Sequence, residues 1–130
     1  MLISLYLGFL SLLYFAISIT VIKARWKNKV SLGAGENNEI LHLVSGHSNF
    51  TSYVPIFLLM ILALELQKFN PLILHILCII FCVGRVIHFI TMKDQEKKIK
   101  LRKPAMMLTF WPLIIAACLN IYTYFLPIFS

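Results

Sequence analysis

Four long apolar stretches constrain what this sequence can fold into. They occupy residues 1–22, 41–66, 71–92 and 105–129, and most of the charged residues lie between them. Each stretch has about the 20 residues that an α-helix needs to cross a hydrocarbon core of roughly 30 Å. The alternating pattern of β-barrel strands is absent, and backbone groups in lipid must be satisfied internally. We therefore predict an all-α membrane protein: a bundle of four transmembrane helices forming one domain over residues 1–130.

Composition supports the membrane assignment. Of the 130 residues, 60% are hydrophobic and 13% are charged, and the mean hydropathy is +0.86. A soluble domain of this length could not bury so much apolar surface. The first stretch has no basic residues ahead of it and no small-residue cleavage site after it, so we interpret it as a retained span rather than a signal peptide.

The basic residues predict the orientation of the spans. Ten of the twelve lie in two short segments, after the first span and between the third and fourth: Lys23, Arg25, Lys27, Lys29, Lys93, Lys97, Lys98, Lys100, Arg102 and Lys103. The positive-inside rule places both segments in the cytoplasm, and both termini on the non-cytoplasmic side. The sequence pI near 9.5 then reflects contact with membrane lipid rather than binding of nucleic acid.

Polar side chains inside the spans mark a candidate site. In the second span they recur at spacings of three and four, on one helical face: His42, Ser45, Asn49 and Ser52. In the third span, Arg85 and His88 share a face. An unpaired arginine deep in a span is costly, so Arg85 should face the second span, a neighbouring chain or a bound anion. Two interpretations remain open: Asn49, Ser52 and carbonyls satisfy Arg85 structurally, or these groups line an anion site that opens toward the basic loops.

The cysteines do not predict a disulfide framework or a metal centre. Cys78, Cys82 and Cys118 all fall inside the spans, where small buried hydrophobes are the common role of cysteine. His75 shares a face with Cys78 and Cys82, but no second cluster completes four ligands. We expect no metal site.

Several segments, in order along the four spans, carry a resemblance to a known family. They are Val21-Ile22-Lys23-Ala24-Arg25 with Lys29-Val30-Ser31, His47-Ser48-Asn49-Phe50 with Tyr53-Val54-Pro55, Gly84-Arg85-Val86-Ile87-His88, and Leu101-Arg102-Lys103-Pro104. With these segments the chain resembles the MAPEG family, the membrane-associated proteins of eicosanoid and glutathione metabolism. The glycine-rich segment Ser31-Leu32-Gly33-Ala34-Gly35 is most similar to its short bacterial branch.

The resemblance implies a homotrimer that binds glutathione as a co-substrate between adjacent subunits, near the cytoplasmic side. It gives glutathione-contacting roles to Arg25, Asn49, Tyr53, Arg85 and His88. The implied chemistry is a glutathione-dependent transferase or peroxidase reaction, in which a cation stabilises the thiolate and the thiolate attacks a lipophilic electrophile or hydroperoxide. The implied location is a bacterial inner membrane.

The chain departs from the family pattern at the positions expected to anchor and activate glutathione. At four positions where the family has a charged residue, this chain has an uncharged one: Trp26, Ser45, Ser52 and Met106. Met92 also stands where the family has a tyrosine. Arg102 is the remaining candidate for a catalytic cation. These departures favour an alternative, a MAPEG-fold inner-membrane protein without glutathione chemistry that binds lipid or another anion. A small drug exporter is disfavoured, because proton-coupled transport needs an acid within a span and Glu39 and Glu65 lie near span ends.

Overall fold

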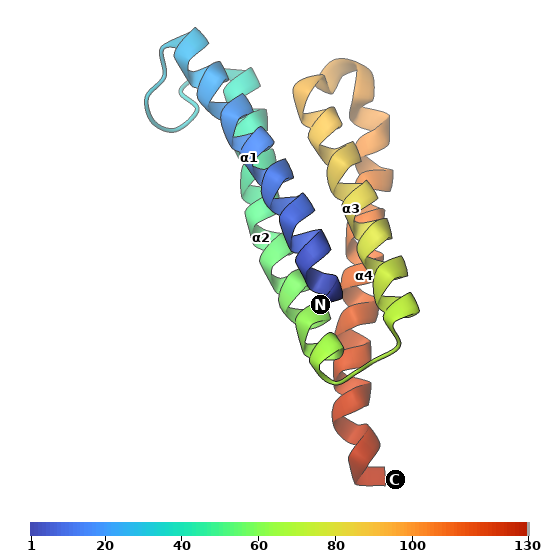
Figure 1. Ribbon diagram of the computed structural model, residues 1–130. Helices are drawn as coiled ribbons and strands as arrows, with labels where there is room; N and C mark the ends of the chain where they lie inside the picture. The colour runs from blue at the N-terminus through green and yellow to red at the C-terminus, as the bar shows by residue number, and fades with distance from the viewer. Residues whose placement is uncertain (130) are drawn as a thin grey trace.

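The computed structural model describes the backbone of residues 1–129 and the side chains of residues 1–94 and 99–127. It contains four helices: α1 (Leu2–Asn28), α2 (Asn38–Leu66), α3 (Pro71–Lys93) and α4 (Gln95–Phe129). Each is long and apolar enough to cross a membrane. The predicted all-α architecture of four transmembrane helices is confirmed (Figure 1).

The helices are arranged as two antiparallel pairs. α3 packs most extensively against α4, and α1 packs mainly against α2. The N-terminus and the α2–α3 turn lie toward one end of the bundle, and the α1–α2 loop and the α3–α4 connection lie at the other (Figure 1). α1 and α3 therefore run in the same direction.

Side-chain caps fix several helix ends. The Asn37 Oδ1 atom accepts from the Ile40 backbone N–H at 3.0 Å, and the Asn70 Oδ1 atom accepts from that of Leu72 at 2.9 Å. The Glu65 carboxylate, near the end of α2, accepts hydrogen bonds from the backbone N–H groups of Leu2 and Ile3. A carboxylate is favourable there because free N–H groups and the helix dipole make a helix N-terminus positive.

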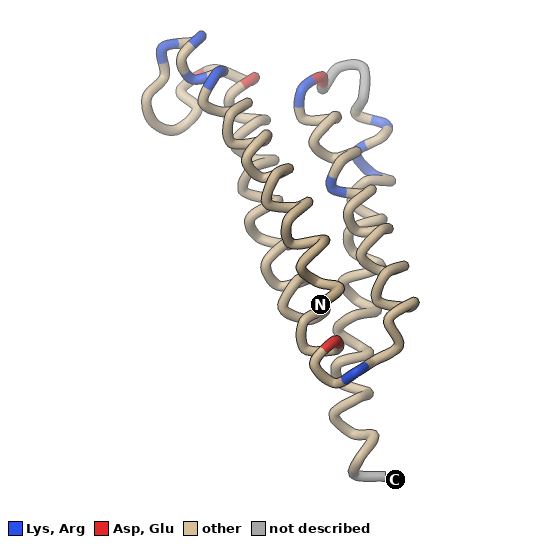
Figure 2. Tube along the Cα trace, viewed as in Figure 1, with Lys and Arg blue, Asp and Glu red and all other residues tan. Residues whose placement is uncertain are grey.

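Two helices extend beyond the apolar stretches on the basic side. α1 continues past Ile22 to Asn28, and α4 begins at Gln95, so that Pro104 lies inside the helix instead of opening it. The basic segment between the third and fourth apolar stretches is therefore largely helical. Lysines and arginines gather at this end (Figure 2), while Lys68 lies in the turn between α2 and α3 at the other end. Which side of the membrane this end faces stays a prediction.

The core is narrow and the outer surface is apolar. The rings of Phe57 in α2 and Phe81 in α3 stack at the centre with their centroids 3.9 Å apart. Large apolar side chains cover the outside, among them Leu5, Leu12, Phe15, Leu59, Leu72 and Ile79. An exposed apolar surface of this extent suits hydrocarbon rather than water.

Candidate functional site

Arg85 of α3 is the centre of the candidate site. Its side chain is 1% exposed. The Nη1 atom donates to the Asn49 Oδ1 atom of α2 at 2.8 Å, and the Nη2 atom donates to the Thr109 hydroxyl of α4. The guanidinium therefore joins three helices inside the bundle.

A glycine next to Arg85 brings α3 and α4 close together. A Cβ atom placed on Gly84 would lie 2.9 Å from the Leu108 Cβ atom and 3.1 Å from the Ala105 carbonyl oxygen. No side chain larger than hydrogen fits there without moving the α4 backbone. Because the helices approach so closely, the short Thr109 side chain can reach the guanidinium.

The partners of Arg85 do not compensate its charge. Asn49 and Thr109 are neutral, and among the described side chains the only ion pair joins Lys27 to Glu39. The Arg85 Nε atom is buried and has no hydrogen-bond partner. A guanidinium has five N–H donors, and a buried donor without a partner is costly. The face of the Phe81 ring lies 5.8 Å from the Arg85 Cζ atom, but the guanidinium retains a free donor and a positive charge that no described carboxylate balances.

Met106 covers this polar group from α4. Its sulfur lies 3.9 Å from the Arg85 Nη2 atom and 4.0 Å from the Asn49 Nδ2 atom. A thioether is only a weak acceptor, and methionine side chains change conformation readily. Met106 therefore acts as an apolar, movable cover over the Arg85–Asn49 pair.

Two further predicted residues lie one helical turn from this pair. Tyr53 follows Asn49 on α2, with its ring edge-on to Phe110 of α4 at 5.2 Å. His88 follows Arg85 on α3 and is 3% exposed. Asn49, Tyr53, Arg85 and His88 therefore form the Arg85 group, whereas the hydrogen bonds and ion pairs of the described side chains join Arg102 to none of them.

Arg25 lies apart from this group. Its Nη1 atom donates to the Gly33 carbonyl oxygen at 2.5 Å, which holds the α1–α2 loop against the end of α1. It lines a groove at the basic end with Trp26 and Lys29. In the part of the chain whose side chains are described, no hydrogen bond joins Arg25 to Arg85 or Asn49.

The polar face of α2 contributes less to the site than its spacing indicates. Of the two interpretations left open, the one in which Ser52 helps to satisfy Arg85 gains no support: the Ser52 hydroxyl donates to the Ser48 carbonyl oxygen at 2.8 Å, and the oxygen acceptors of Arg85 among the described side chains are Asn49 and Thr109. Ser45 likewise donates to the Leu41 carbonyl oxygen at 2.7 Å. Both serines are exposed, since a helix offers these short hydroxyls a carbonyl one turn back.

Sequence reasoning missed Thr109 as a partner of Arg85. The available signal was a hydroxyl in an otherwise apolar part of the fourth span. A single sequence does not say which face of α4 turns toward α3, so the contact emerges only from the packing.

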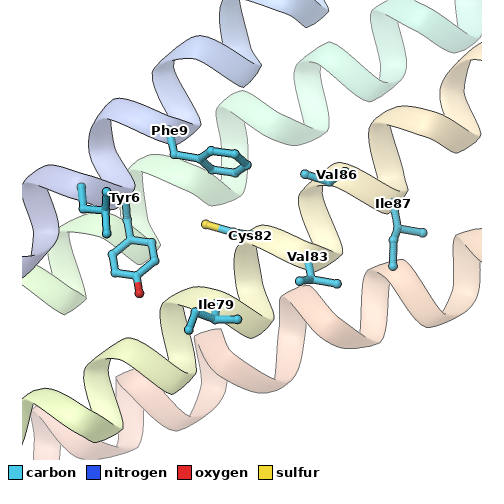
Figure 3. A pocket seen from close by; sticks show the side chains of 8 residues that line it. Tyr6, Phe9, Ile79, Cys82, Val83, Val86 and Ile87 are labelled. Atoms are coloured by element: carbon cyan, nitrogen blue, oxygen red, sulfur yellow. The ribbon is translucent and has the colours of Figure 1, made fainter.

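The face of α3 that carries the cysteines packs against α1. The His75 Nδ1 atom lies 2.7 Å from the Tyr6 hydroxyl. Cys82 lines an apolar pocket between the two helices, opposite Tyr6 and Phe9 (Figure 3). Among the described residues, no three His, Cys, Asp or Glu side chains are grouped to hold a metal ion.

The chain matches one family profile and two curated proteins along most of its length. The profile of the MAPEG family matches residues 3–122. The chain is similar to the Inner membrane protein YecN of Escherichia coli K12, with 25% identity over 119 residues that cover 92% of this chain and 89% of the relative. YecN of Escherichia coli O6:H1 matches over the same extent with the same identity. No solved structure matches.

Proposed function

Since this chain belongs to the MAPEG family and is an integral membrane protein, we propose that it is a glutathione-dependent transferase or peroxidase acting on lipophilic electrophiles. The observation that carries the proposal is the buried Arg85–Asn49 pair, with its free Nε donor and unbalanced charge. A cation beside a thiol lowers the thiol pKa and so produces the nucleophilic thiolate.

The residues of the site suit a small anionic peptide. Arg85 supplies charge and a free donor for a carboxylate or thiolate, and the Asn49 amide holds the guanidinium in place. Met106 must turn aside before an anion can reach Arg85. Glutathione brings the reactive thiol when bound, and Arg102, near the basic end of α4, is the candidate for the cation that activates this thiol.

The separation of Arg25 supports a site shared between subunits. The exposed face of α2 carries the short side chains of Ser45, Ser48 and Ser52, and small residues of this kind are enriched where transmembrane helices pack closely. We propose a homotrimer in which this face meets a neighbouring copy, so that Arg25 of the partner subunit approaches the Arg85 group. By analogy with the Escherichia coli relative, we propose an inner-membrane location. From the positive-inside rule we propose that both termini are non-cytoplasmic.

Glutathione binding by the protein purified in detergent tests the proposal directly. Calorimetry should detect binding at millimolar glutathione. Arg85→Ala should weaken it at least about tenfold, because a hydrogen bond to a charged group contributes roughly 1.5–3 kcal/mol. Lys68→Ala, at the opposite end of the bundle (Figure 2), is the control and should bind as the wild type does. A wild-type protein that binds no glutathione would refute the proposal.

A second function is favoured by Met106 and the serines of α2. The thioether covers the polar pair, and the hydroxyls of Ser45 and Ser52 are turned back onto their own helix. These contacts leave few polar groups free to anchor glutathione, and we propose as the second function a MAPEG-fold protein that binds a lipid or another anion without glutathione chemistry. Native mass spectrometry separates the two functions: a co-purified anion or lipid that is lost in Arg85→Ala, with glutathione excluded, supports the second.

A further inference from the structure

A second charged groove lies at the basic end, where α1, α2 and the end of α3 meet. Lys23 and Lys27 line it from α1, where they are one helical turn apart, and Lys93 lines it from the end of α3. Glu39 and Leu43 of α2, with further residues of α1, complete a groove of about 330 Å³. None of these residues belongs to the Arg85 group.

The charge of this groove is not balanced within the described residues. Its one carboxylate, Glu39, lies 3.9 Å from the Lys27 ammonium, and these side chains are 51% and 74% exposed. Exposed pairs of this kind are weak. The Lys93 ammonium lies over the Phe89 ring at 4.4 Å from its centroid, and the ion pairs of the described side chains include neither Lys23 nor Lys93. Two lysines therefore present charge to any anion that enters.

Two of these helices, α1 and α3, also line an apolar groove deeper in the membrane. It has a volume of about 410 Å³ and includes Phe9 of α1, and Val86 and Ile87 of α3 (Figure 3). Val86 and Ile87 precede Lys93 by six or seven residues, which places them about 10 Å deeper along the helix. One leaflet contributes about 15 Å of the hydrocarbon core. A chain anchored at the lysines would therefore reach the apolar groove.

We propose that the α1–α3 face binds an anionic phospholipid, with its phosphate at Lys23 and Lys93 and an acyl chain against Val86 and Ile87. Basic pockets between transmembrane helices characteristically bind anionic headgroups. A free phosphate would leave the apolar groove unused. A second copy would bring its own basic end toward these lysines, which like-charge repulsion disfavours.

Native mass spectrometry of the full chain in detergent tests the site. Phosphatidylglycerol and phosphatidylcholine with identical acyl chains are titrated against the wild type, which should bind phosphatidylglycerol more tightly. Lys23→Gln with Lys93→Gln should reduce that preference about 30-fold. Lys100→Gln with Lys103→Gln removes the same charge from residues outside the groove and should change the preference less than about threefold. Ile87→Trp narrows the apolar groove and leaves the charges intact, so it should weaken the binding of both lipids.

Several results would overturn the proposal. Equal losses in the two double variants would indicate general attraction to the basic end. Displacement of the lipid by millimolar inorganic phosphate would indicate a free-anion site. A change of oligomer mass in Lys23→Gln with Lys93→Gln, at unchanged lipid binding, would place a second copy in the groove. Glutathione binding should be unchanged in that variant, so the lipid site and the proposed function stand or fall separately.

Discussion

The cost of burying Arg85 is offset by individual hydrogen bonds from two other helices. An arginine at the centre of a membrane helix costs roughly 2.5–3.5 kcal/mol on insertion scales. Asn49 and Thr109 accept from its two Nη atoms, which recovers part of this cost without supplying a countercharge. Asn49 was predictable, since it follows the spacing of the polar face of α2. Thr109 was not, because its role depends on how α4 is rotated against α3.

Thr109→Val tests this account of Arg85. Valine has nearly the same shape but no hydroxyl, so the buried hydrogen bond from the Arg85 Nη2 atom is lost together with the bond that Thr109 donates to the Ala105 carbonyl oxygen of its own helix at 3.1 Å. We expect a destabilisation of about 1–3 kcal/mol, measured by thermal unfolding in detergent. The matched control is Thr123→Val, whose hydroxyl only donates to the Asn120 carbonyl oxygen of its own helix at 3.0 Å. If both variants unfold at the same temperature, the Thr109 contact contributes nothing.

Close approach between helices depends on glycines whose surroundings differ. A Cβ on Gly84 would meet the Leu108 Cβ and the Ala105 carbonyl oxygen of α4, neither of which moves without the helix. A Cβ on Gly46 would lie nominally closer, 2.2 Å from the Met92 sulfur, but that sulfur belongs to a flexible side chain. Nothing lies within 4 Å of a Cβ on Gly8. The shortest distance therefore does not mark the least tolerant position.

Alanine substitutions at Gly84 and Gly46 should destabilise the protein in the opposite order from the one that the Cβ distances alone suggest. Gly84→Ala should destabilise the protein by about 1–3 kcal/mol, because overpacking forces α3 and α4 apart. Gly46→Ala should cost less, since Met92 can turn away. Gly8→Ala should be neutral or stabilising by about 0.5–1 kcal/mol, because alanine is the better helix former. Thermal unfolding of the three variants checks the order, and equal effects at Gly84 and Gly8 would contradict it.

The sequence predicts that the four helices exist better than it predicts the residues at which they begin and end. The four apolar stretches identify the four helices because hydrocarbon permits few other backbone structures. The stretches do not identify where α1 and α4 end on the basic side, because charged residues such as Lys27 and Lys100 are good helix formers outside the hydrocarbon. Pro104 illustrates the same limit: a proline suits the first turn of a helix, yet α4 begins at Gln95.

For the whole molecule, hydropathy is sufficient to predict the fold class, and the family match agrees with it. The assembly of the site is a different matter. Asn49 and Arg85 meet inside the chain with Tyr53 and His88 one turn away on the same helices, whereas Arg25 lines a separate groove. The residues on the polar faces of α2 and α3 come together because these two faces meet inside the bundle. Contacts between copies depend on surfaces that a single chain does not bring together.

The basic end predicts the orientation of the whole bundle in the membrane. Cysteines introduced at two positions test this orientation. In a variant with Cys78, Cys82 and Cys118 replaced by alanine, one cysteine is placed at Lys68 in the α2–α3 turn or at Lys100 near the basic end of α4. The positive-inside rule expects Lys68→Cys to react with a membrane-impermeant maleimide in intact spheroplasts. Lys100→Cys should react only after the inner membrane is permeabilised. The opposite pattern would invert the topology and would place the basic end, with both the glutathione and the lipid sites proposed near it, on the non-cytoplasmic side.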